Sequence, residues 1–340
     1  MKKAFVVWEG AITVALFAFL CAGNFSCGTN SDEPHRLDLK GEVVSGDIFI
    51  GNPTSLLLYD NLILICDRYE SKMLTIVDRN TFSLVGRHIN EGRGPGEVTG
   101  RVEWSVLGDR LYAYQANGGG ALNIYSLPDM AYIESVMIDN SSAAVRRMPD
   151  YYVGNSAIGE GRLQIFDKNG KYLFAGSDYP DSGNNISDSF RFAAYQGYYC
   201  THPSENRYVF GGAYSDNIEF HAIRDGEHIL VKEYKGVDVR ATMDNEMIDI
   251  SDDALLGYKG AWGGEKWCYM LYMGKTLAEN EGRRTMWSDN VFLYTWDGEL
   301  DTACKLDRSV RAIMVDEANG NLYGIARDDE GYQHIVKFKL

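Results

Sequence analysis

The chain has 340 residues and a formal net charge of −15 at pH 7. An acidic surface repels the phosphate backbone of nucleic acids, so we expect no nucleic-acid partner. The length would allow two ordinary domains, but all-β folds often use a chain of this size as one domain. The number of domains therefore depends on the internal repeats.

The N-terminus carries the features of an export signal. Lys2 and Lys3 precede an apolar stretch over residues 11–22, which is too short to cross a bilayer as a helix. Cys27 follows Ser26 and precedes a polar, acidic segment, an arrangement that resembles a bacterial lipoprotein box with Cys27 as the lipidated residue. The alternative is a secretory signal that is cut without lipidation. We expect a signal peptide over residues 1–26, a tether over residues 27–36, and a lipid anchor that holds the protein in the outer membrane, facing the periplasm or the cell surface.

The cysteines after this segment lie at positions 66, 200, 268 and 304. None forms a CxxC motif or a Cys/His cluster with zinc spacing, so no cofactor is expected. Calcium at the acidic segment 236–253 or zinc stays as an alternative, although that segment lacks EF-hand spacing. We interpret the cysteines as small buried side chains, and their spacing does not determine any disulfide.

One strand pattern recurs six times after the signal. Short alternating apolar strands, at intervals of 41 to 73 residues, are centred on Ile76, Ile124, Ile165, Phe220, Leu293 and Val336. Several are followed by Asn-Gly or Asp-Gly turns, which favour tight hairpins. Four short strands in each unit of this length predict an all-β fold, a six-bladed β-propeller with four antiparallel strands per blade.

The last unit is one strand short. Residues 310–340 supply three strands, whereas Leu37–Val44 is a spare strand near the other end of the chain. Because closure removes an exposed sheet edge, we expect this segment to form the outer strand of the last blade and to complete a single domain over residues 37–340. Outside the signal, the sequence predicts at most a helical turn or two, over Asp244–Leu256.

Three parts of the chain resemble the six-bladed, TolB-like propeller lipoproteins of Gram-negative bacteria, a group similar in shape to NHL-type propellers. They are the loop Glu91–Glu97, the strands Trp267–Lys275 with Val291–Gly298, and the segment Arg311–Asp316 with Asn321–Ile325. The resemblance covers about residues 37–340 and implies the propeller fold and an exported lipoprotein. It implies no settled activity and no catalytic residues. The limits of the third and fourth blades, within Asn140–Asn217, stay open.

Long loops indicate where a ligand binds, because the connections between blades and the turns between the second and third strands of a blade emerge on one face. After the first blade, Arg93 and Glu97 lie among glycines whose amides could hold an anion, with a tight structural loop as the alternative. In the fifth blade, Arg284 and Trp287 lie in the segment 274–288, and we expect Trp262 beside them. A flat aromatic ring beside a guanidinium group suits a sugar or a carboxylate, with packing as the alternative.

These features predict a monomeric binding module that presents a shallow, acidic-rimmed face to a carbohydrate, a peptide or a protein partner. The predicted ligand contacts are Arg93, Glu97, Trp262, Arg284 and Trp287. Two alternatives remain: a metal-assisted lyase or hydrolase at the channel mouth, and a scaffold in an envelope complex. The sequence contains no Gly-x-Ser-x-Gly motif, so a serine hydrolase is unsupported.

Overall fold

The computed structural model describes residues 33–46, 48–116, 119–140, 142–156, 161–179, 187–244 and 247–340. The predicted signal peptide and Cys27 lie outside these residues. Pro34–Leu340 forms one compact unit. Within the described residues, no helix is both long enough and apolar enough to cross a membrane.

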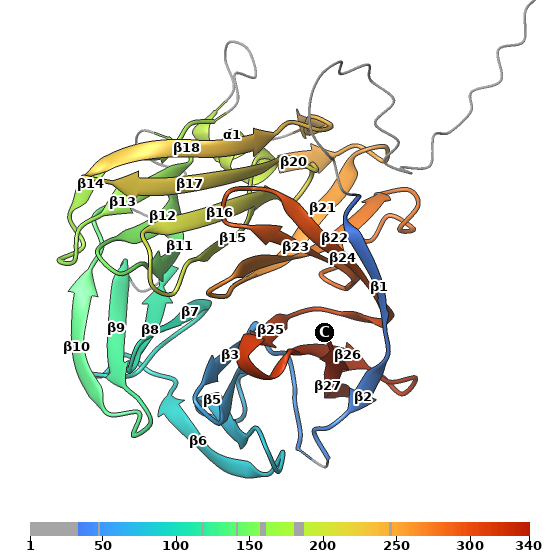
Figure 1. The fold of residues 1–340 in the computed structure, drawn as a ribbon. Helices are drawn as coiled ribbons and strands as arrows, with labels where there is room; N and C mark the ends of the chain where they lie inside the picture. Colours follow the sequence, from blue (N-terminus) through green and yellow to red (C-terminus); the bar gives the residue numbers. More distant parts are fainter. Residues whose placement is uncertain are drawn as a thin grey trace, which may run out of the picture. The chain divides into compact units, whose positions relative to one another are not determined.

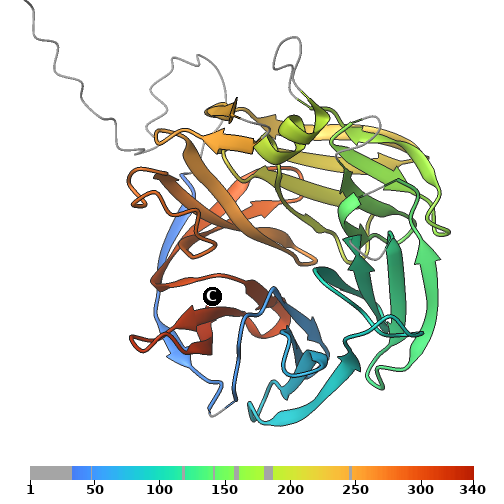
Figure 2. The same cartoon turned by 180° about the vertical axis from the view of Figure 1, so that it is seen from behind.

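In the described part of the chain, six antiparallel blades follow one another around a central axis (Figures 1 and 2). Blade one contains β3 (Ser55–Tyr59), β4 (Leu62–Cys66), β5 (Lys72–Asp78) and β6 (Leu84–Asn90). Blade two contains β7 (Val102–Leu107), β8 (Arg110–Gln115), β9 (Ala121–Ser126) and β10 (Tyr132–Met137). Blade three contains β11 (Ser142–Arg147), β12 (Tyr152–Ser156), β13 (Leu163–Phe166) and β14 (Tyr172–Ser177).

The other three blades follow the same order from the axis outward. Blade four contains β15 (Gly197–Thr201), β16 (Arg207–Gly212), β17 (Ile218–Arg224) and β18 (Glu227–Tyr234). Blade five contains β21 (Leu255–Gly263), β22 (Trp267–Thr276), β23 (Ser288–Thr295) and β24 (Leu300–Val310). Blade six contains β25 (Ile313–Asp316), β26 (Asn321–Arg327), β27 (Gln333–Lys339) and β2 (Gly41–Val43). The predicted six-bladed propeller is confirmed, and the third and fourth blades now have defined limits.

The N-terminal strand closes the ring in two steps. Gly41–Val43 pairs antiparallel with β27, with Val43 opposite Val336, as the sequence predicts for the outer strand of the last blade. The preceding strand, β1 (His35–Leu39), instead pairs parallel with β24 and adds a fifth strand to blade five. A Cβ atom on Gly41 would lie 2.4 Å from Cγ1 of Val336, so the crossing from one blade to the next requires a residue without a side chain.

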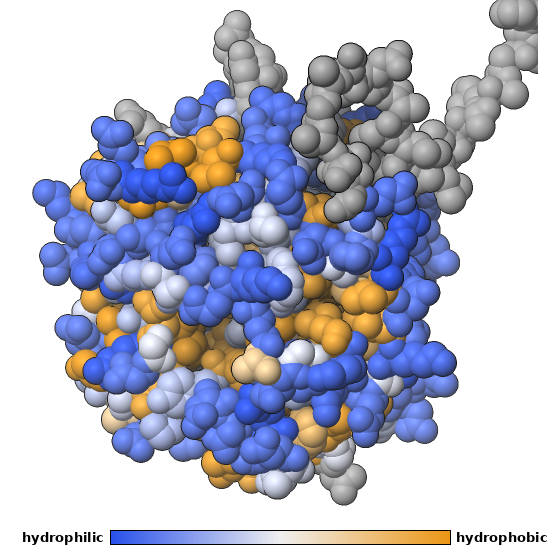
Figure 3. Space-filling view, in the orientation of Figure 1, coloured by the Kyte–Doolittle hydropathy of each residue, from blue (hydrophilic) through white to orange (hydrophobic). Residues whose placement is uncertain are grey.

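One hydrophobic cluster fills each interface between neighbouring blades. Trp104 and Leu64, for example, lie in the cluster between blades one and two. A blade that packs on both faces buries successive residues of a strand, which explains the nearly continuous apolar runs in β4 and β5. The face seen in Figure 3 is mainly hydrophilic around its edge, and apolar side chains gather across its middle.

Short helices and strands lie in the connection from blade three to blade four and in the connection from blade four to blade five. Helix α1 (Asp188–Ala194) begins after Ser187, whose hydroxyl accepts the backbone N–H of Phe190 at 3.2 Å. The predicted helical turn over Asp244–Leu256 is wrong, because β19 (Ala241–Asp244) and β20 (Met247–Ile250) form a hairpin there. Ile250 packs with Leu256 and Met273 of blade five, and this burial stabilises the hairpin. A 3-10 helix, η2 (Glu317–Asn319), joins β25 to β26.

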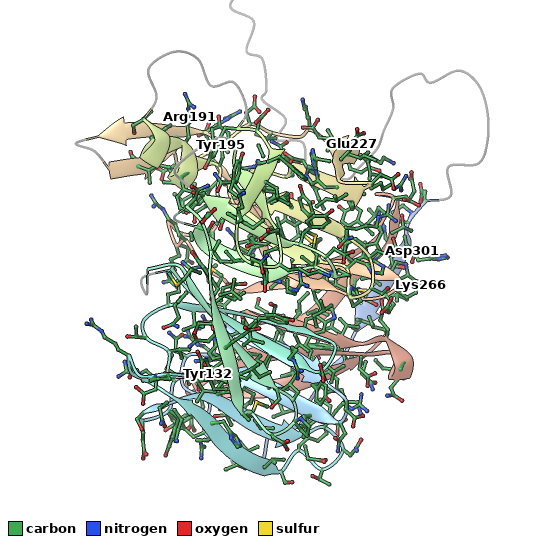
Figure 4. The ribbon with its side chains drawn as sticks, turned by 90° about the vertical axis from the view of Figure 1, so that its left-hand side faces the viewer. Tyr132, Arg191, Tyr195, Glu227, Lys266 and Asp301 are labelled. Atoms are coloured by element: carbon green, nitrogen blue, oxygen red, sulfur yellow. The ribbon has the colours of Figure 1, made fainter. Side chains whose placement is uncertain are left out.

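The strand order gives the propeller two distinct faces. We call the face that carries the blade-to-blade connections and the turns between second and third strands the connection face. Figure 4 shows the two faces from the side. On the left are Arg191 and Tyr195, which belong to the connection that contains α1. On the right are Glu227, Lys266 and Asp301, which lie next to turns of the opposite face. Because β1 runs parallel to β24, the outer strand of blade five, His35 lies at the opposite face.

Candidate functional site

A cavity of about 670 Å³ runs along the central channel. Its lining comes from the inner strands of all six blades, namely β3, β7, β11, β15, β21 and β25. Residues 284–286, from the turn between β22 and β23, complete the wall at the connection face. Cavities of this size in proteins accommodate small molecules or a few residues of a polymer.

The cavity lining is basic, although the whole chain is acidic. Of the described residues that line it, five are basic and one is acidic, and these are Arg101, Arg146, Lys259, Arg284, Arg311 and Glu103. Glu103 is already paired with Arg146, whose Nη2 lies 2.6 Å from its Oε1. The basic lining thus differs from the net charge of the chain, because that charge reflects the outer surface rather than the few residues around the axis.

Lys259 is the most enclosed of these cations. Lys259 is 5% exposed, and its Nζ donates a hydrogen bond to the carbonyl oxygen of Ala213 at 3.0 Å. The ammonium group lies 5.5 Å from the centre of the Tyr214 ring, and no carboxylate within the described residues pairs with it. Burial lowers the pKa of Lys259 to about 8.

The backbone at Lys259 is irregular. The register between β21 and β22 shifts between Leu256 and Tyr258 and again between Tyr258 and Gly260. The inner strands β3, β7, β15 and β25 pair with their neighbours without such shifts, whereas β11 has one, between Ser142 and Ala144. β-Bulges bend a strand and redirect a side chain, and they are common beside binding sites.

Neutral donors accompany the cations in the channel. The hydroxyl groups of Tyr199 and Ser105 are buried and have no hydrogen-bond partner among the described residues. Tyr198 contacts Sδ of Met286 through its hydroxyl group at 2.9 Å. Burial raises the pKa of Tyr198 to about 12, so this phenol stays protonated at neutral pH. Tyrosine and serine side chains from several blades therefore surround the cavity, but the hydroxyl groups of Tyr199 and Ser105 are buried behind its surface.

Trp287 is not among the residues that line the cavity, and the two guanidinium groups beside it come from blade six rather than from its own loop. Cζ of Arg327 lies 4.6 Å from the Trp287 ring centre, and Cζ of Arg311 lies 5.8 Å from it. Burial, and then the charge of Arg327, lower the pKa of Arg311. Sequence reasoning missed both arginines, because only the neighbouring positions of blades five and six bring them to Trp287.

Arg284 and Trp262 both line the cavity, but they do not lie side by side as predicted. In the β21–β22 hairpin, Leu255 lies opposite Thr276 while Gly263 lies opposite Cys268, so Trp262 is at the far end from the loop that carries Arg284. Trp262 contacts the clusters of blades one, two, five and six, and it packs across the end of the channel at the opposite face. Arg284 is exposed at the connection face.

The loop at Arg93 and Glu97 is tightly built. Oε2 of Glu97 accepts the backbone N–H of Gly94 at 2.9 Å, and the backbone N–H of Gly92 bonds to the carbonyl oxygen of Val98 at 2.9 Å. The amides of these glycines are thus used within the loop. Arg93 is exposed, and neither it nor Glu97 lines the channel cavity.

The cysteines of the described residues are all buried and free, namely Cys66, Cys200, Cys268 and Cys304. Burial raises the pKa of Cys200 to about 12, which keeps this thiol protonated and unreactive. Within the described residues, no group of three or more His, Cys, Asp or Glu side chains is arranged to hold a metal ion.

Comparison with known proteins agrees with this architecture. No curated protein matches the chain. A protein from Bacteroides fragilis that is described as exported has 10% identity and a TM-score of 0.57, and the match covers 91% of this chain and 99% of that protein. A member of the DUF4221 family from Bacteroides vulgatus has 13% identity and a TM-score of 0.59, and the match covers 88% of this chain and 96% of that protein. At these identities the likeness concerns the fold.

The sequence itself matches a family model over residues 32–318, which is most of the propeller. That family is described as TolB-like, with a six-blade propeller-like fold. The matched range contains the Gly-rich loop and the fifth-blade strands that carry the resemblance, and it ends before Asn321–Ile325 of the last blade. The chain therefore belongs to the TolB-like six-bladed propeller family.

Proposed function

We propose that this protein is a binding module that takes a small ligand, or the end of a larger one, into its central channel through the connection face. The observation that carries this proposal is the cavity of about 670 Å³ lined by all six inner strands. A partner protein that docks on a flat face would need no such volume. A sugar or a short peptide segment fits a cavity of this size.

The proposed contacts follow the depth of the channel. Arg284 lines the cavity at the connection face, and Trp262 supplies an aromatic surface at the other end. Trp287 is not part of the lining but packs beside Arg311, which is, so it is a proposed contact for the part of the ligand that leaves the channel. Arg93 is a proposed contact for a ligand that extends over the rim, and Glu97 supports it by holding the loop through the amide of Gly94. Aromatic and arginine side chains dominate binding energies in many interfaces, so these residues are suitable anchors.

The proposal includes export and a lipid anchor at Cys27 in the outer membrane. The lipoprotein-like segment around Cys27 supports it, and the similar protein from Bacteroides fragilis is described as exported. The described propeller begins near His35, at the face opposite the connection face. An anchor that joins the propeller there would leave the channel mouth accessible. Replacement of Cys27 by Ser should release the protein from the membrane fraction, and retention of that variant would contradict lipid anchoring.

The test is a binding screen with soluble oligosaccharides and short peptides, followed by calorimetry on variants. We expect Arg284→Ala and Trp287→Ala each to weaken the binding of a hit by about tenfold or more. Arg283→Ala is the matched control, because Arg283 pairs with the exposed Glu281 and does not line the cavity.

Two outcomes would overturn the proposal. Wild-type affinity in both test variants would place the ligand outside the channel mouth. A stable protein partner that co-purifies and still binds both variants, with no small ligand found, would favour the scaffold alternative instead.

A further inference from the structure

We propose that the channel ligand carries a carboxylate and that Lys259 is its anchor. This inference rests on the proposed function, because it specifies which chemistry the channel selects. It assigns the role to a residue of the inner strand of blade five rather than to the loops at the rim.

The first argument is the unbalanced charge at Lys259. An ammonium group that is buried without a carboxylate is expensive, and proteins normally pair such a charge. Lys259 has only the carbonyl oxygen of Ala213 as a hydrogen-bond acceptor among the described residues, which leaves donor capacity on its Nζ. A ligand carboxylate would supply the missing negative charge.

The second argument is that the surroundings contain donors and further positive charge. Arg101 and Arg284 line the same cavity and have no ion pair with any described residue. Glu103, the one acidic residue among the described residues of the lining, is paired with Arg146. A neutral ligand would leave the excess positive charge of this lining uncompensated.

The third argument is the backbone. Register shifts on both sides of Tyr258 place Lys259 in an irregular part of an inner strand, where a regular strand would be expected for stability alone. Features that reduce stability are retained most often at functional sites. Burial lowers the pKa of Lys259 to about 8, so the cationic form that would bind a carboxylate still predominates at pH 7.

The test uses matched probes that differ only in the carboxylate, measured by calorimetry on the full propeller. One arm compares glucuronate with glucose, and the other compares N-acetylated dipeptides with their C-terminal amides, so that an acidic sugar and a peptide terminus are distinguished. We expect the carboxylate member of one pair to bind more tightly than its neutral partner. Lys259→Met should reduce that affinity by about 10- to 100-fold.

The control is Lys171→Met, which removes a lysine from the exposed surface and should leave affinity unchanged. A second readout separates an anchor from a structural residue. If Lys259 serves binding, Lys259→Met should unfold at a higher temperature than the wild type, whereas a structural lysine would give a less stable variant.

The inference is overturned if Lys259→Met binds the carboxylate probe like the wild type, if the neutral partners bind as tightly as the carboxylates, or if no carboxylate probe binds. Neutral probes that bind and that are lost in Arg284→Ala would refute the anchor but keep the proposed function. Absence of all binding in the channel would refute both.

Discussion

The proposed anchor Lys259 reduces the stability of the folded state. Its ammonium group is buried beside one carbonyl oxygen, and the pKa falls from 10.5 to about 8. In the unfolded chain the group is solvated, so below pH 8 the folded state carries a penalty on the order of 3 kcal/mol. Above pH 8 the folded state releases its proton first, and the penalty disappears as the pH approaches the unfolded value of 10.5.

This linkage predicts how the free energy of unfolding depends on pH. Lys259→Met should be more stable than the wild type at pH 7, and the difference should shrink as the pH rises from about 8 towards 10.5. Denaturant titrations of both proteins across this range measure it. A difference that stays constant with pH would show that the side chain is solvated in the folded state.

At the scale of the elements, a buried polar cluster joins blades three and four. The Arg162 guanidinium group, next to β13, pairs with Glu219 of β17, and Ser177 donates to Oε2 of Glu219 at 2.9 Å. Nε2 of His221 lies 3.1 Å from the same carboxylate oxygen. Burial by itself would raise the pKa of Glu219, but the hydrogen bond from His221 and the charge of Arg162 hold it at about 2.

From this cluster we predict that the carboxylate of Glu219 is needed for the stability of the folded protein. Glu219→Gln removes the charge opposite Arg162, which is 5% exposed, and should lower the free energy of unfolding by about 3 to 5 kcal/mol. Denaturant unfolding measures the change. Glu227→Gln, on the exposed start of β18, is the control and should be nearly neutral. Equal stability of the two variants would mean that the cluster contributes no more than a surface residue.

At the scale of the whole molecule, the ring depends on the N-terminal strands. β1 covers the edge of blade five and β2 completes blade six, so the first strands of the propeller join its last two blades. Without them, β24 and β27 would each expose an unpaired edge, and such edges promote aggregation. Leu39, which is buried against blades five and six, would also lose its contacts.

Two truncated chains test this closure. A chain that begins at Pro34 keeps both strands and should remain soluble with the stability of the mature protein. A chain that begins at Val44 lacks them and should unfold at a lower temperature and aggregate, as measured by thermal scanning and size-exclusion chromatography. If the two chains behaved alike, the closing strands would not stabilise the ring.

The candidate site could be predicted only in part. Arg284 and Trp262 were identified from their residue types and from strand order, and both line the cavity. Lys259 was missed because it lies within an apolar strand, Leu255–Gly263, where a single lysine gives no sign of its depth. Arg311 was seen only as part of a family-like segment, since its proximity to Trp287 depends on how neighbouring blades pack.

The fold was readable from the residues alone because its information is local. Alternation of apolar side chains, turn residues and the repeat interval each act over a few residues, and together they define strands, hairpins and the number of blades. Two features could not be read from local sequence: the positive charge of the channel, and the division of the closing segment between two blades. Each depends on parts of the chain that are distant in sequence and meet only in the folded protein. The pairing of strands determines the structure of each blade, but it does not determine which side chains of different blades face one another across the channel. Those contacts form only when the six blades close into a ring.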